Sequence, residues 1–293
     1  MGREKWKSSP LTPLSSRIWL HFLHLRHSLY VPLSLTVLRE VCLYLSPSPL
    51  LVSLSGTKLL LFSFRSQSSS QQKLDFHFKP GSMVCLTDTD SVICVAGGDS
   101  LRRCFEVSLN DYTLTRRADL EAMRAWPGVV LYKGLTYAFG GVGYNLSSEC
   151  FDCCSNHWTS LPNMHVAKHS FTPTPYGRRI YLCAPQAGTQ LEVFSPHVPS
   201  YELLPLSFPI QCSSSVSLLL KDLVVVLTSE GEGLRWSVGE GEMRVEGLRC
   251  GRLEWLRCWG NVVRSQTCAY WMTGAGTVVK YAMGENTVSQ YEL

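Results

Sequence analysis

Short apolar runs recur about every 43 residues through most of this chain. Two of them, Val92–Gly98 and Leu135–Gly141, end in a glycine pair, and Gly97 lies 43 positions before Gly140. Further runs occur at a similar spacing before and after these two, at Leu50–Gly56, Ile180–Ala184, Leu223–Thr228 and Thr267–Gly274. A constant period of this length indicates repeated supersecondary units, each of which buries its apolar faces against its neighbours.

Each repeat unit contains four candidate strands. A second β-rich run follows each apolar run, and an aromatic residue lies inside every one: Phe64, Phe105, Phe151, Phe194, Trp236 and Tyr281. One more run precedes each apolar run, and Trp158 and Tyr201, again 43 positions apart, mark a fourth. A four-stranded sheet with two apolar faces can be buried on both sides when such sheets repeat around an axis.

The repeats therefore predict an all-β fold, a β-propeller that occupies residues 39–293. That length holds about six units, so we expect six four-stranded blades. A β-sandwich with fortuitous glycine pairs is the alternative, and the constant spacing favours the propeller. Residues 1–38 lie outside the repeats, and we expect them to be a disordered extension or to supply one strand that helps to close the ring.

The unit at Pro127–Met164 resembles the kelch repeat. It has the glycine doublet Gly140-Gly141 after its second strand, the aromatic Phe151 in its third strand and Trp158 in its fourth. The other units keep only parts of this pattern. The resemblance implies a propeller of the kelch type, and it implies a protein-binding module that serves as a substrate receptor or a scaffold.

A kelch-like enzyme, such as a copper radical oxidase or a sugar-modifying enzyme, is the alternative function. Copper chemistry of that kind needs tyrosine and histidine ligands that converge on one metal. His165 and His169 are four positions apart, but they lie between blades and near prolines, which disfavour a helix. The sequence has no nucleophile elbow and no phosphate-binding loop. We therefore predict a protein that is not an enzyme and that uses no cofactor and no metal.

Composition limits the classes of binding partner and the cellular compartment that we expect for this chain. The net charge of +4 comes without a block of Lys and Arg, so we expect no nucleic acid partner. No uninterrupted apolar run approaches the roughly 20 residues of a membrane-spanning helix, so we expect no membrane association. Cys94, Cys183 and Cys268, among twelve cysteines, lie inside apolar β-like runs. We expect these three to be buried and unbonded, as in a reducing, cytoplasmic compartment.

The candidate binding residues lie in loops that strand alternation sends to one face of a propeller. They are Arg102, Arg103, Tyr144 and Asn145 in second-to-third loops, and Arg124, Trp126 and Lys168 in blade-to-blade links. Trp, Tyr and Arg are enriched at binding hot spots. The four cations together predict a basic mouth that binds another protein through an acidic peptide segment.

Overall fold

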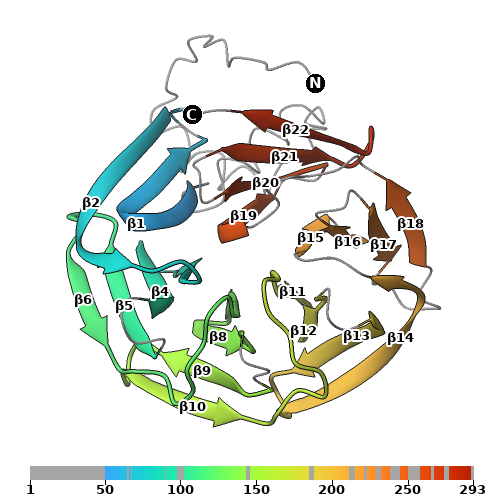
Figure 1. The fold of residues 1–293 in the computed structure, drawn as a ribbon, viewed down its shortest axis with the longest axis horizontal. Helices are drawn as coiled ribbons and strands as arrows, with labels where there is room; N and C mark the ends of the chain where they lie inside the picture. Colours follow the sequence, from blue (N-terminus) through green and yellow to red (C-terminus); the bar gives the residue numbers. More distant parts are fainter. Residues whose placement is uncertain are drawn as a thin grey trace, which may run out of the picture.

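The structure is a computed structural model, and strands arranged around a ring account for nearly all of its regular structure (Figure 1). It describes residues 50–291 apart from 65, 67, 89, 98–101, 143–145, 185–187, 211–214, 221–222, 229–231, 238–244, 250–257, 265–266 and 274–276. Within these residues the elements are strands β1 to β22, and none is a helix. The predicted all-β propeller fold is confirmed.

Three consecutive four-stranded antiparallel sheets form the best-defined part of the ring, and we name them blades A, B and C. Blade A contains β3 (Met83–Leu86), β4 (Ser91–Gly97), β5 (Arg103–Ser108) and β6 (Leu114–Arg117). Blade B contains β7 (Gly128–Tyr132), β8 (Leu135–Phe139), β9 (Ser148–Asp152) and β10 (His157–Leu161). Blade C contains β11 (Thr174–Tyr176), β12 (Arg179–Leu182), β13 (Gly188–Ser195) and β14 (Ser200–Ile210). The repeating runs that contain Gly97, Gly140 and Ile180 thus supply the second strands of adjacent blades.

Two further sets of four strands continue the ring. Blade D contains β15 (Ser215–Leu220), β16 (Leu223–Thr228), β17 (Glu232–Ser237) and β18 (Val245–Arg249). Blade E contains β19 (Cys258–Arg264), β20 (Cys268–Thr273), β21 (Val278–Ala282) and β22 (Thr287–Tyr291).

The sixth position of the ring is filled by a two-stranded hairpin of β1 (Leu50–Ser63) and β2 (Ser68–Phe78). β1 pairs with β19 at Ser53 and Gly260, so the hairpin and blade E form one six-stranded sheet. The expectation of six four-stranded blades is therefore not met within the described residues. The physical reason is that only Thr57 separates the run Leu50–Gly56 from the next β-rich run, which contains Phe64, and one residue is too few for a turn. The two runs therefore form the single strand β1, whose pairing with β2 shifts in register between Gly56 and Lys58.

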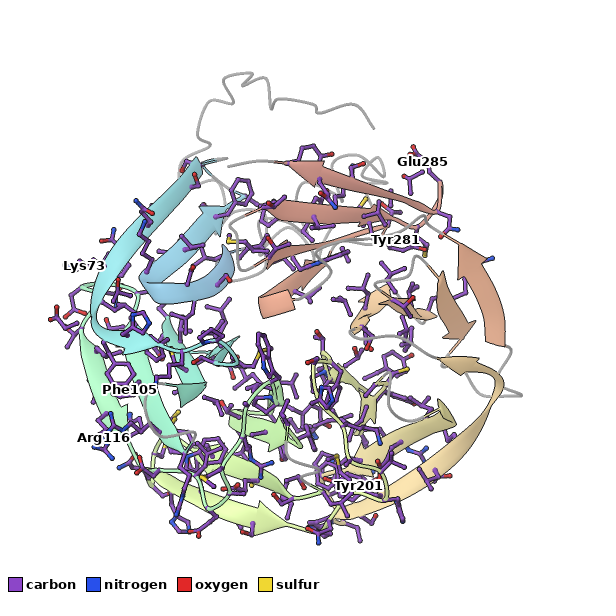
Figure 2. All side chains as sticks on the ribbon, viewed as in Figure 1. Lys73, Phe105, Arg116, Tyr201, Tyr281 and Glu285 are labelled. Atoms are coloured by element: carbon purple, nitrogen blue, oxygen red, sulfur yellow. The ribbon has the colours of Figure 1, made fainter. Side chains whose placement is uncertain are left out.

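Apolar side chains between neighbouring sheets hold the ring together. The hairpin packs on blade A through Val52, Leu54, Leu59, Leu61, Leu74 and Phe78, which meet Val92, Cys94, Phe105 and Val107. Figure 2 labels Phe105, whose ring lies 4.4 Å from that of Phe76 and 5.6 Å from that of Phe78 between ring centroids. On its other face the hairpin places Leu51 and Phe62 against Met272 and Val278 of blade E. The hairpin therefore closes the ring between the first and last blades.

Trp158 and two of the three cysteines that were predicted to be buried lie inside the fold. Trp158 is 2% exposed and joins the apolar cluster that also contains Ile93 and Cys104 of blade A, so it packs against the neighbouring blade. Cys94 and Cys183 are buried free thiols, as predicted, and burial raises the pKa of Cys94 above its ordinary value. Cys268 is also a free thiol but only half-buried, because it begins β20 at the end of the sheet.

Residues 1–38 and the first part of the predicted propeller, residues 39–49, lie outside the described residues. In the described part of the chain, no helix is present that has the length and hydropathy needed to span a membrane.

Candidate functional site

Three chain segments lie side by side at one end of blade B. They are the link from blade A to blade B (118–127), the ends of the loop from β8 to β9 (140–142 and 146–147) and the link from blade B to blade C (162–173). We call their described residues, with Arg102, the loop face. The backbone N–H groups of Val142 and Gly141 donate to the carbonyls of Ala125 (2.6 Å) and Lys168 (2.8 Å). The N–H of Met164 donates to the carbonyl of Leu146 (2.8 Å), so all three segments are tied together.

Arg124 lies under this face, with no exposed surface. Its guanidinium donates to the Glu149 carboxylate at 2.6 Å and to the carbonyls of Gly140 (2.7 Å) and Ser147 (2.8 Å). Burial lowers the pKa of Arg124, and the charge of Glu149 opposes that shift. The expectation that Arg124 is exposed at a basic mouth is wrong, because its charge is neutralised inside the fold.

Lys168 is buried in the same manner one repeat later. Its ammonium group donates to the Glu192 carboxylate and, at 3.2 Å, to the carbonyl of Val166. Glu192 also accepts the backbone N–H of His165 at 2.6 Å. Burial lowers the pKa of Lys168, and Glu192 opposes the shift. The expected exposure of Lys168 is therefore also wrong.

The remaining predicted residues are scattered. Arg102 is exposed on the loop face, and its Nε donates to the Leu120 carbonyl at 2.6 Å. Arg103 is half-buried in β5, with its guanidinium 5.8 Å from the centroid of the Phe76 ring of the hairpin. Trp126 is half-buried in the link to blade B. Tyr144 and Asn145 lie outside the described residues.

Sequence reasoning missed the apolar side chains of the loop face. Met123 is 65% exposed, Val142 49% and Leu146 37%, and we call these three residues the apolar patch. Among the described residues the remaining exposed large apolar side chain is Val198, at 72%, in the turn from β13 to β14. Third-to-fourth turns lie at the opposite end of a blade from the loop face. The available signal was that Met123, Val142 and Leu146 lie in connecting segments and not in predicted strands.

Metal chemistry has no support in the described part of the chain. No group of three or more His, Cys, Asp or Glu side chains there has a geometry that could hold a metal ion.

Comparison with known proteins identifies the repeat. The family model of the kelch motif matches residues 123–165, which cover blade B and the adjoining part of each link of the loop face. No curated protein matches the chain. The chain is therefore a β-propeller that carries a kelch motif, and the match coincides with the unit that resembles the kelch repeat most closely in sequence.

Proposed function

We propose that this chain is a protein-binding module whose partner docks on the loop face over blade B. The kelch motif and the propeller fold support this function in general, because rigid rings of loops serve as docking surfaces. The apolar patch carries the proposal. Exposed apolar side chains gathered on one face mark interaction sites more often than isolated ones do.

The energetics of the patch fit such a role. Full burial of one Met, Val or Leu side chain contributes about 1.5–3 kcal/mol, so the patch supplies a useful share of the free energy of binding. The backbone hydrogen bonds of Gly141, Val142 and Met164 fix the segments in advance. A partner therefore meets a surface whose main-chain ordering is largely complete before binding.

We further propose that the module serves as a substrate receptor or a scaffold. A substrate receptor and a scaffold both use a surface of this kind, and the kelch resemblance supports both. We no longer propose an acidic peptide as the partner, because two of the four cations of the predicted basic mouth, Arg124 and Lys168, are buried in ion pairs with glutamates. We also propose a cytoplasmic location, which the eight free cysteines of the described residues support.

The test compares three forms of the full chain: wild type, the double variant Met123→Asp/Leu146→Asp and the control Val198→Asp. The control places one negative charge on an exposed apolar residue away from the loop face, whereas the double variant adds two on that face. We expect wild type and control to capture the same partner from a cell lysate, and the double variant to retain a tenth of it or less. Equal melting temperatures would show that folding is intact. Identical capture by all three proteins would contradict the proposal.

A further inference from the structure

The charged groups of the loop face are nearly all engaged. Arg124 pairs with Glu149, and Lys168 with Glu192. His165 Nδ1 lies 3.0 Å from a Glu192 carboxylate oxygen. Neither cation of the two ion pairs has a free charge to offer to a partner, and Nδ1 of His165 is already in contact with Glu192.

The outer part of the link to blade B is engaged as well. Asp119 pairs with Arg116 at 3.0 Å. The Arg102 guanidinium is held at the Leu120 carbonyl. Figure 2 labels Arg116 at the outer edge of the ring, so the Asp119 pair lies toward the rim.

Glu121 differs from these groups. Its backbone N–H donates to Glu149 at 2.7 Å, so the residue is fixed in the link. Its carboxylate is exposed, and within the described residues it makes no hydrogen bond and no ion pair. It stands two residues before Met123, the most exposed member of the apolar patch. The loop face therefore combines an apolar patch with one available negative charge.

We propose that the partner segment is an apolar peptide with a lysine or arginine next to its apolar anchor. This inference rests on the proposed function and adds the chemistry of the partner. The apolar residues cover Met123, Val142 and Leu146, and the cation pairs with the Glu121 carboxylate. An exposed ion pair adds modest affinity but discriminates strongly against a like charge.

The probe is a displayed library of random 16-residue peptides, selected against the full wild-type chain. We expect the selected peptides to contain two or three large apolar residues and a neighbouring Lys or Arg. Replacing that cation with Glu in a synthetic peptide should weaken binding to wild type by about fivefold or more. The variant Glu121→Lys should reverse this preference and bind the Glu-containing peptide better.

The matched control is Glu285→Lys, which makes the same change at an exposed carboxylate in the turn from β21 to β22. Figure 2 shows Glu285 on the opposite side of the ring from Arg116. We expect this control to keep the wild-type preference. If peptides lose binding in Met123→Asp but show no reversal in Glu121→Lys, the inference is overturned and the proposed function stands. If no selected peptide depends on Met123, both are overturned.

Discussion

Two buried ion pairs occupy equivalent places in neighbouring repeats, but they organise their surroundings differently. Arg124 and Lys168 lie 44 positions apart in successive links, and their partners Glu149 and Glu192 lie 43 positions apart in successive third strands. Both cations have no exposed surface, and each carboxylate also accepts a backbone N–H of the link. Each pair therefore fastens the link to the blade that follows it.

The difference lies in what else the cation can reach. The planar fork of Arg124 also binds Gly140 and Ser147, so it holds both ends of the β8–β9 loop. Within the described residues, which exclude 185–187 of the β12–β13 loop, the ammonium group of Lys168 donates to the nearby Val166 carbonyl in addition to its carboxylate. The planar, multidentate guanidinium of Arg124 thus fixes a loop as well as a link. The apolar patch lies over the pair that fixes both.

The glycine doublet connects the two ion pairs. Gly140 has a φ of +60°, and a Cβ added there would lie 2.2 Å from the Lys168 carbonyl oxygen. The doublet therefore lets the second link pass directly over the end of β8. This close approach explains why blade B needs glycine at this position.

The largest expected effect comes from breaking the arginine pair. Arg124→Met should lower the free energy of unfolding by about 3–5 kcal/mol, because Glu149 is left buried without its counter-charge. Denaturant titration measures this loss. The double variant Arg124→Met/Glu149→Gln should recover part of it, since no unpaired charge remains. A loss below about 1 kcal/mol in the single variant would contradict the structural role of the pair.

The next prediction separates the hydrogen bonds that the Arg124 guanidinium makes to the loop from its positive charge. Arg124→Lys keeps a cation beside Glu149 but loses the bonds to Gly140 and Ser147. Each such bond contributes about 0.5–1.5 kcal/mol, so we expect a loss of about 2 kcal/mol and faster hydrogen exchange at residues 140–142 and 146–147. If exchange in this loop stays at the wild-type rate, the arginine does not hold the loop.

A smaller effect is expected where a tyrosine of blade C is hydrogen-bonded to a serine of blade B. The Tyr201 hydroxyl lies 2.5 Å from Ser148 Oγ, which in turn donates to the Pro162 carbonyl at 3.0 Å. Tyr201→Phe should cost about 1 kcal/mol, because one buried hydrogen bond is lost. The thermal melt of this variant, compared with that of Tyr112→Phe in the β5–β6 turn of blade A, measures the cost. Equal melting temperatures for the two variants would show that the hydrogen bond of Tyr201 to Ser148 does not stabilise the fold.

The smallest effect on stability is expected at the surface. Met123→Asp should change the free energy of unfolding by no more than about 0.5 kcal/mol, because the side chain is 65% exposed. Denaturant titration of this variant beside Arg124→Met contrasts two adjacent residues of one link. A loss comparable to that of Arg124→Met would show that Met123 serves the fold.

The fold was largely predictable from the sequence because strand repeats leave a regular trace. The second strands of blades A to E and the strand of Trp158 were placed correctly by the 43-residue spacing, whereas the run Leu50–Gly56 became part of β1 of the hairpin. The site was less predictable, because burial of Arg124 and Lys168 depends on carboxylates about 25 positions later. Their signal was present, since a cation and a glutamate that each recur at the repeat spacing indicate an internal pair. The exposure of the apolar patch depends on loop conformation, which no period encodes.

The most direct test of the account is a hydrogen-exchange footprint of the full chain with and without a selected peptide. Binding at the loop face should protect the backbone amides of residues 118–127, 140–142, 146–147 and 162–173. The turns at the other end of blades B and C, residues 153–156 and 196–199, should exchange as they do in the free protein. Protection confined to those turns, with the loop face unchanged, would contradict the central claim.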